Sequence, residues 1–301
     1  MMRSVISARQ LYKKFKNFQL TIPELVIPKG FATALIGENG AGKSTLMHIL
    51  AGTRLDYQGE LCFFEQYNDK DREKPDCKVR ERIGYIGPNH YFMPHWTVKQ
   101  IADISSLLFE GFHADAYRDY CSTLGITAGS SEFSKKVSEL SDGTRMKLML
   151  SAVFARDTDC LLMDEPASPL DPLMRDRLCD LIRTYIESGS GERSVFFSTH
   201  NISDMENVTD YAIIMEQGRI VEAGFVEDLK EKYILVKGEK EEEEAASRFL
   251  YSKISSAYGF EGVCLAENLD RLAGMHIITE IPTLSQISVA IMKANTSLKL
   301  G

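Results

Sequence analysis

The chain has 301 residues, of which 44% are hydrophobic and 26% are charged. These fractions are those of ordinary globular proteins, and they exclude collagen-like, fibrous and largely disordered classes. Lysine and arginine supply 35 positive charges against 43 negative ones, and the net charge of -8 argues against a general nucleic-acid binder held by phosphate contacts. At this length we expect one large domain, or one domain with a small appendage.

The cysteines and the N-terminus indicate a cellular compartment. The 6 cysteines are widely separated, so none has the spacing of a metal-binding or redox pair. They predict reduced thiols in a cytosolic setting. No apolar signal sequence opens the chain, and no window approaches the roughly 18 apolar residues that a bilayer span needs. We therefore expect a cytoplasmic protein that reaches a membrane only through a partner.

The first 36 residues alternate polar and apolar side chains around prolines and a glycine, which is typical of short strands joined by turns. The last of these strands, 32–36, runs directly into a glycine-rich loop. Residues 44–50 follow, with apolar side chains on one helical face. The predicted order is strand, loop, helix.

The glycine-rich loop, 37–44, matches the phosphate-binding pattern G-x-x-x-x-G-K-[ST]. In this pattern, backbone N–H groups close around phosphates and the helix N-terminus adds positive potential. We expect Lys43 to reach the β- and γ-phosphates and Ser44 to bind Mg²⁺. The predicted nucleotide-binding residues of this segment are Gly37, Glu38, Asn39, Gly40, Ala41, Gly42, Lys43, Ser44 and Thr45.

The middle of the chain combines helical and strand patterns. Apolar residues recur at helical spacing over 97–157, which predicts a helical block inserted between strands. Two continuous apolar runs, 160–163 and 194–199, favour strands buried on both faces of a parallel sheet. Segment 173–188 between them is a predicted crossover helix.

Two carboxylates, Asp164 and Glu165, follow the apolar run 160–163. An acid at the end of a buried strand is the arrangement that holds Mg²⁺ beside a phosphate-binding loop. Asp164 is therefore a predicted metal ligand, directly or through water. Glu165 would face the γ-phosphate and polarise the attacking water as a general base.

With these motifs in this order, residues 1–228 resemble the nucleotide-binding subunits of ATP-binding cassette (ABC) transporters. Segment 140–144 is similar to the family signature LSGGQ, which caps the γ-phosphate held by the opposite subunit. Ser141 and Gly143 match this pattern, whereas Asp142 and Thr144 depart from it. Near an incoming triphosphate the Asp142 carboxylate would repel by like charge, so we expect weaker ATP-driven closure.

The resemblance assigns roles to three more residues. Asp171 lies in a segment that resembles the D-loop, which follows the strand acids. His200 takes the place of the family's switch histidine. Phe15 lies 22 positions before Gly37, where the family carries an aromatic residue that stacks on adenine, and the neighbouring Tyr12 competes for this role.

One departure from the family concerns the segment after 83–86. There the family usually has a Gln that senses Mg²⁺ and couples to the membrane subunit, whereas this chain has Gly87, Pro88 and Asn89. Glycine and proline have no side-chain oxygen. Either Asn89 substitutes in a shifted loop or the site lacks this ligand, so the sequence supports nucleotide binding more firmly than coupling and hydrolysis.

The composition shifts after Gly224, where a segment with the pattern strand, helix, strand, strand, helix runs to Lys293. We predict a small α+β domain over 229–301. The acidic run at 239–244 reads as a solvated first helical turn, which the helix dipole favours.

The resemblance implies an α/β P-loop NTPase fold: an ABC cassette over 1–228 with an antiparallel β subdomain and a helical subdomain at about 90–157, followed by the small C-terminal appendage. It implies an ATPase that binds ATP and Mg²⁺, with Glu165 and His200 as catalytic residues. Segments 97–98 and 109–112 are most similar to bacterial half-cassettes that serve exporters of antibiotics or peptides.

The same resemblance implies partners. A signature completes a phosphate-binding loop only in the opposite subunit, so one cassette per chain implies a homodimer or heterodimer. The transport path would be a separate transmembrane permease subunit, which would hold this protein on the inner face of the cell membrane. No direct nucleic-acid binding is expected.

Two other functions stay open at this point. The missing Gln and the altered signature favour a dimerising regulatory protein with weak or no hydrolysis, whereas the intact acid pair and His200 oppose it. A cassette ATPase that acts on DNA or ribosomes is disfavoured by the charge, by the single cassette, and by the absence of a long coiled-coil insertion between Thr45 and Ser141.

Overall fold

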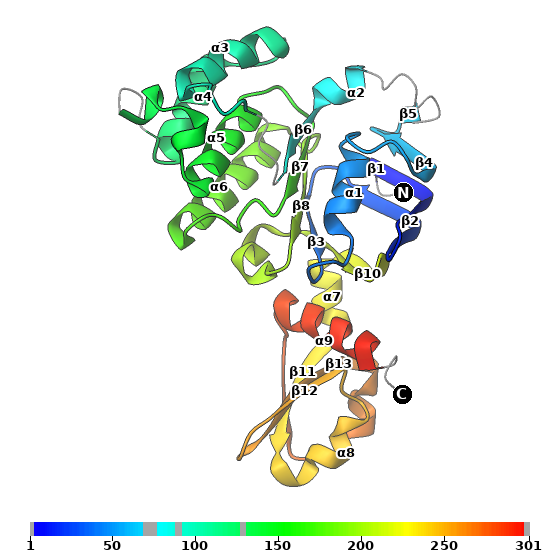
Figure 1. The fold of residues 1–301 in the computed structure, drawn as a ribbon. Helices are drawn as coiled ribbons and strands as arrows, with labels where there is room; N and C mark the ends of the chain where they lie inside the picture. The colour runs from blue at the N-terminus through cyan, green and yellow to red at the C-terminus, as the bar shows by residue number, and fades with distance from the viewer. Residues whose placement is uncertain (1–2, 69–76, 88–91, 127–130, 298–301) are drawn as a thin grey trace.

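The computed structural model describes residues 3–68, 77–87, 92–126 and 131–297. It contains a central sheet with helices on one side, an antiparallel sheet on the other, and a C-terminal segment below them (Figure 1). Within these ranges, none of the helices combines the length and apolarity required to cross a bilayer. The 6 cysteines form no disulfide, as the sequence predicts.

The central sheet has the spatial order β10-β9-β3-β8-β7-β6. Neighbouring strands are parallel, except for β10 and β9. All residues of β3, β7 and β8 are buried, which explains their continuous apolar sequences and confirms the predicted strands. The strands are β3 (Ala32–Ile36), β6 (Ile83–Ile86), β7 (Cys160–Asp164), β8 (Ser194–Thr199), β9 (Tyr211–Glu216) and β10 (Arg219–Phe225).

Helices precede and follow these strands as predicted, including the helix after the glycine-rich loop and the crossover between β7 and β8. The helices up to the end of the central sheet are α1 (Lys43–Leu50), α2 (Cys77–Arg82), α3 (Val98–Leu108), α4 (Ala114–Thr123), α5 (Asp142–Phe154), α6 (Pro172–Ser188) and α7 (Val226–Lys232).

Alternate side chains of the central sheet enter two separate hydrophobic clusters, one on each face. On one face, Leu162 and Phe196 pack with α1. On the other face, Leu161 and Phe197 pack with α5 and α6. Helices α1 and α5 therefore lie on opposite faces of the central sheet (Figure 1).

An antiparallel sheet packs on the α1 side and shares its hydrophobic cluster. Its strands lie in the order β2-β1-β4-β5, which confirms the strand pattern of the first 36 residues. They are β1 (Ser4–Lys14), β2 (Gln19–Pro28), β4 (Gln58–Phe63) and β5 (Tyr67–Asn68).

The predicted helical block forms a cluster of its own from α3, α4 and α5. Ile101, Tyr117 and Leu148 are fully buried at its centre. Helix α3 begins at a capping box, in which Gln100 N–H donates to the Thr97 hydroxyl and Thr97 N–H donates to the Gln100 side chain.

The C-terminal segment forms an antiparallel sheet in the order β12-β13-β11-β14. The described part holds one strand more than predicted, because β12 is short and polar and so gives no alternating signal. The acidic run divides between a 3-10 turn and the first turn of α8, so only part of it opens a helix. The elements are β11 (Tyr233–Glu239), α8 (Glu243–Ser247), β12 (Ser252–Ser255), β13 (Gly259–Leu265), β14 (Ile277–Glu280) and α9 (Leu284–Ser297).

Helix α9 packs the C-terminal segment against the rest of the molecule. The fully buried Leu284 and Ile287 belong to the same cluster as α5, α6 and the central sheet, together with Leu229 of α7. Leu284 N–H also donates to the Glu206 carboxylate at 2.9 Å. The C-terminal segment thus shares a hydrophobic core with α5, α6 and the central sheet.

We predict that Ile287→Ala lowers the free energy of unfolding by about 2–5 kcal/mol, because it removes a fully buried side chain and leaves a cavity. Val289→Ala is the matched control, since Val289 lies on the same helix and is 41% exposed. Urea unfolding of both variants checks this. Equal losses would contradict the shared core.

Candidate functional site

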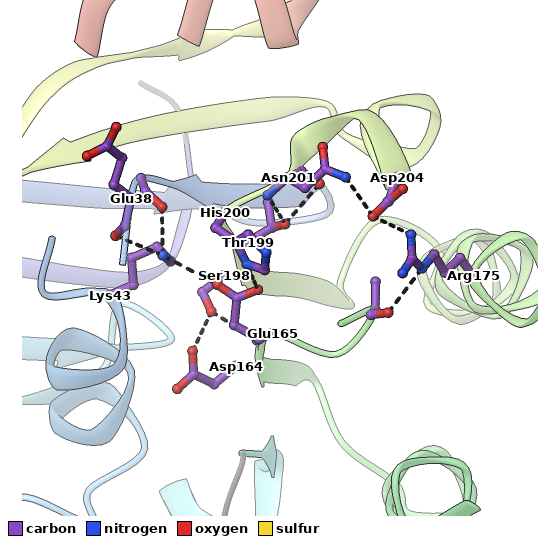
Figure 2. A network of polar contacts seen from close by, with 12 residues as sticks. Glu38, Lys43, Asp164, Glu165, Arg175, Ser198, Thr199, His200, Asn201 and Asp204 are labelled. Atoms are coloured by element: carbon purple, nitrogen blue, oxygen red, sulfur yellow. Dashed lines mark hydrogen bonds and ion pairs between the residues drawn. The ribbon is translucent and has the colours of Figure 1, made fainter. Parts of the chain in front are cut away.

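The glycine-rich loop connects β3 to α1 and folds around Lys43 (Figure 2). Lys43 is buried, and its Nζ donates hydrogen bonds to the carbonyl oxygens of Gly37 at 2.6 Å and Glu38 at 3.2 Å. Gly37 N–H donates to the Thr199 carbonyl at 3.3 Å, which ties the loop to β8. The ammonium group is therefore held inside the loop, where phosphate oxygens would compete for its protons.

Two glycines of the loop are required by the space around them. A Cβ at Gly37 would lie 2.4 Å from the Met215 carbonyl oxygen. Gly42 has a φ of 106°, and its Cβ would lie 2.7 Å from the Phe18 ring. Among the other predicted loop residues, Ala41 is buried, Thr45 is half-buried, and the exposed ones are Glu38, Asn39, Gly40 and Ser44.

The carboxylate of Asp164 lies at the end of β7 and is 1% exposed. Its Oδ1 accepts a hydrogen bond from Ser198, its register partner on β8. Its Oδ2 is buried with no hydrogen-bond partner among the residues that the structure describes. An unpartnered buried carboxylate oxygen is unfavourable, and a cation would relieve it.

These residues fit Mg²⁺ bound together with a nucleotide. The described ranges contain no group of three His, Cys, Asp or Glu side chains that could hold a metal by themselves. Mg²⁺ usually takes one or two carboxylates plus substrate phosphates rather than an all-protein cage. Asp164 and the exposed hydroxyl of Ser44 match that limited set.

Glu165 is the residue on which the other predicted groups converge (Figure 2). Its Oε1 lies 3.4 Å from Lys43 Nζ, and its Oε2 lies 2.8 Å from His200 Nδ1. Its φ of 54° is in the left-handed region, and its N–H donates to the Ser198 hydroxyl at 3.0 Å. Strained conformations of this kind cluster at functional sites.

The contact with Glu165 determines which protons His200 can offer. When the carboxylate accepts this hydrogen bond, Nδ1 is the donor. In a neutral ring, Nε2 is then an acceptor. His200 can therefore donate to a phosphate oxygen while it holds Glu165 only as an imidazolium.

Arg175 of α6 connects the segment after Glu165 with the segment after His200. Its Nε donates to the Leu170 carbonyl at 2.9 Å, and one of its terminal nitrogens lies 2.8 Å from the Asp204 carboxylate. This ion pair fixes both segments relative to α6.

Asp171 is the N-cap of α6, where its Oδ1 accepts a hydrogen bond from Met174 N–H at 3.1 Å. This capping contact gives Asp171 a structural role within its own chain. The carboxylate is exposed, so its predicted role towards a nucleotide stays a prediction.

The signature residues lie at the start of α5, across the central sheet from α1. Ser141 caps α5 by accepting a hydrogen bond from Thr144 N–H at 3.2 Å. A Cβ at Gly143 would lie 2.9 Å from the Pro169 carbonyl oxygen, so the glycine allows the helix to approach the D-loop. Asp142 pairs with Arg145 at 3.1 Å, which offsets part of the charge that we expected to repel a triphosphate.

Phe15 follows β1 and lies near the phosphate-binding loop. Its ring centroid is 5.9 Å from that of Phe18, whose ring in turn contacts Gly42. This line of contacts runs from Phe15 to the phosphate-binding loop, and the stacking of Phe15 on a base stays a prediction. Tyr12, the competing aromatic, lies within β1 opposite Thr21.

The segment where the family has Gln is only partly described. A Cβ at Gly87 would lie 2.4 Å from the Tyr85 hydroxyl oxygen, so Tyr85 occupies the space that a side chain would need there. Burial and the nearby charge of Asp164 raise the pKa of Tyr85. Pro88 and Asn89 lie outside the described residues, and the substitution by Asn89 is not tested.

Sequence reasoning missed three residues of this site: Ser198, Phe18 and Arg175. Ser198 offered one signal, because a hydroxyl in a fully buried strand needs a hydrogen-bond partner. The other two offered none, since their contacts depend on how separate elements meet.

Comparisons with known proteins show the family of this chain. A family model described as ABC transporter matches residues 20–168. A thiamine import ATP-binding protein of Haemophilus ducreyi is 30% identical over 200 residues, which are 65% of this chain and 89% of that protein. An uncharacterized ABC transporter ATP-binding protein of Nostoc sp. is 24% identical over 84% of this chain and 75% of its own length.

Solved structures show the same fold. The ATP-binding subunit of an ABC transporter superposes with a TM-score of 0.63 at 21% identity, over 75% of this chain and 92% of that one. A dimeric ATP-binding cassette with bound ADP and phosphate has a TM-score of 0.62 at 17% identity, over 73% of this chain and 98% of the other.

We predict that Ser198→Ala lowers ATP turnover about tenfold or more, because both Asp164 and the backbone of Glu165 lose a hydrogen-bond partner. Ser194→Ala is the matched control. Ser194 is a buried serine at the other end of the same strand and accepts from Gly30 N–H. Each variant should lose about 1–3 kcal/mol of stability. Equal turnover in the two variants would contradict a positioning role for Ser198.

Proposed function

Because this chain belongs to the family of ABC transporter ATP-binding proteins, we propose that its phosphate-binding loop, Asp164, Glu165 and His200 form one ATP-hydrolysing site. The chain is an ATPase subunit that energises transport through a separate membrane subunit. The observation that carries the proposed site is the convergence of Lys43 and His200 on the Glu165 carboxylate from two different strand ends.

In the first step of the proposed mechanism, phosphate oxygens replace protein oxygens as the hydrogen-bond partners of Lys43. The triphosphate enters the loop and accepts hydrogen bonds from backbone N–H groups and from the Lys43 ammonium, which now contacts Gly37, Glu38 and Glu165. When phosphate oxygens replace the Glu165 contact, this carboxylate becomes free to bind water. Nucleotide binding thus frees Glu165 to act as the general base.

Mg²⁺ would be held by Asp164 and Ser44. When bound, this cation would neutralise part of the negative charge of the phosphates. Ser198 keeps the Asp164 carboxylate in position from the neighbouring strand.

Glu165 then acts as the general base. Its carboxylate orients a water molecule and takes its proton as the water oxygen attacks the γ-phosphorus and the bond to the bridging oxygen of ADP breaks. His200 holds the carboxylate through Nδ1 and turns its other ring nitrogen, Nε2, to the γ-phosphate. Most of the rate enhancement comes from the positioning of these groups and from their electrostatic stabilisation of the transition state.

The position of the signature supports a dimer. Ser141 and Gly143 start a helix on the face of the central sheet opposite α1, so they would reach a nucleotide of a second cassette. We propose that two cassettes, identical or related, enclose ATP, with Phe15 stacked on adenine and Asp171 in the D-loop near the interface.

The proposed location follows from the partner. A transmembrane permease subunit would hold this chain at the inner face of the cell membrane. The thiamine import protein of H. ducreyi carries an import function in its name, whereas the sequence pattern of this chain favours exporters. Binding to the permease, without nucleic-acid contacts, would determine which solute is moved.

We predict that Glu165→Gln keeps ATP affinity within about twofold and lowers turnover by about 10²–10⁴, because the amide binds water but cannot take its proton. Calorimetric titration and phosphate release measure these two effects. Glu267→Gln, an exposed change in the C-terminal segment, is the control.

Lys43→Ala completes this experiment, since it should abolish ATP binding as well as turnover. Unchanged turnover in Glu165→Gln would remove Glu165 from its role. Wild-type protein that binds ATP but releases no phosphate, alone or with its permease, would instead support a nucleotide-dependent regulator.

A further inference from the structure

Two cations lie beside the ring of Phe15, and one carboxylate binds both of them. Lys13 Nζ lies 5.3 Å and Arg54 Cζ lies 5.2 Å from the ring centroid. Asp56 binds both cations, with 2.5 Å between its Oδ2 and Lys13 Nζ and 3.2 Å between its Oδ1 and Arg54. The ring is thus flanked by two positive groups that share one carboxylate.

Two segments place these side chains, namely β1 and the loop between α1 and β4. Lys13 lies near the end of β1, Arg54 follows α1, and Asp56 precedes β4. The backbone of Arg54 is fixed by its N–H, which donates to the His48 carbonyl at 3.0 Å. The cluster therefore has a defined position beside Phe15.

The cluster is connected to the phosphate-binding loop by direct contacts. Phe15 packs on Phe18, and Phe18 packs on Gly42, the residue immediately before Lys43 and α1. A nucleotide with its phosphates in the loop could extend its base along this line to Phe15. Arg54 would then be the next group that the base meets.

The two cations differ in their freedom to move. The Lys13 side chain is 14% exposed, whereas that of Arg54 is 35% exposed. The Lys13 hydrogen bond and the charge of Arg54 hold the pKa of Asp56 below its ordinary value, so its carboxylate stays ionised and retains both cations. Arg54 is the side chain that can shift to admit a planar group and still keep its ion pair.

We propose that Arg54 is a nucleotide-binding residue, whose guanidinium forms the second wall of a base slot opposite Phe15 and is held there by Asp56. This inference rests on the proposed ATP site. A guanidinium is flat and stacks on aromatic faces. Stacking tolerates any base because every base has a π face. ATP and GTP should therefore gain alike from Arg54, and a ligand without a base should gain nothing.

The test compares ATP, GTP and inorganic tripolyphosphate by calorimetric titration of the full chain. We expect Arg54→Ala to weaken ATP and GTP about threefold to tenfold and to leave tripolyphosphate unchanged. Arg118→Ala is the matched control, because Arg118 is also exposed and paired with one aspartate, Asp115, at 2.5 Å. This control should leave all three affinities unchanged.

The other outcomes overturn the inference in distinguishable ways. Unchanged ATP affinity in Arg54→Ala removes Arg54 from the base slot. An equal loss for ATP and tripolyphosphate means that Arg54 acts only through its charge. The proposed ATP site fails if the wild-type chain binds neither ATP nor tripolyphosphate, or if Lys43→Ala binds both of them as well as wild type does. The base slot then fails with it.

Discussion

Parallel pairing of β3, β8 and β7 is the constraint on which the site depends. These strands are neighbours and run in the same direction, so their carboxyl ends meet at one edge of the central sheet. The phosphate-binding loop leaves β3, His200 follows β8, and the acid pair ends β7. Ser198 locks this edge, because its one hydroxyl accepts from the backbone of Glu165 and donates to Asp164. Groups far apart in the chain therefore form one cluster.

The central sheet also separates α1, which follows the phosphate-binding loop, from α5, which begins at the segment similar to the family signature. Its two faces bury separate hydrophobic clusters, with α1 on one and α5 on the other. Ser141 caps α5 on the face opposite α1, which is why we propose that the signature reaches the nucleotide of a second cassette. The C-terminal segment shares the α5-side cluster through α9 and leaves the α1 side to the antiparallel sheet.

The sequence allowed the buried strands and the acid pair to be predicted because their physical causes are local. A strand buried on both faces is apolar throughout, and a phosphate-binding loop needs glycine at fixed positions, as at Gly37 and Gly42. Strand β12 was missed because its four residues are mostly polar. The contacts of Phe18, Arg175 and Arg54 depend on the meeting of distant elements, which no local pattern encodes. The exporter likeness stays a prediction.

The central claim is that the described cluster is one half of an ATPase site, which a second cassette completes. The most direct measurement is phosphate release per mole of purified chain at saturating MgATP over a wide range of protein concentration, with light scattering to give the mass of the species. We expect a specific activity that rises with concentration and levels off when the chains are paired. Full specific activity in solutions that contain only single chains would contradict it.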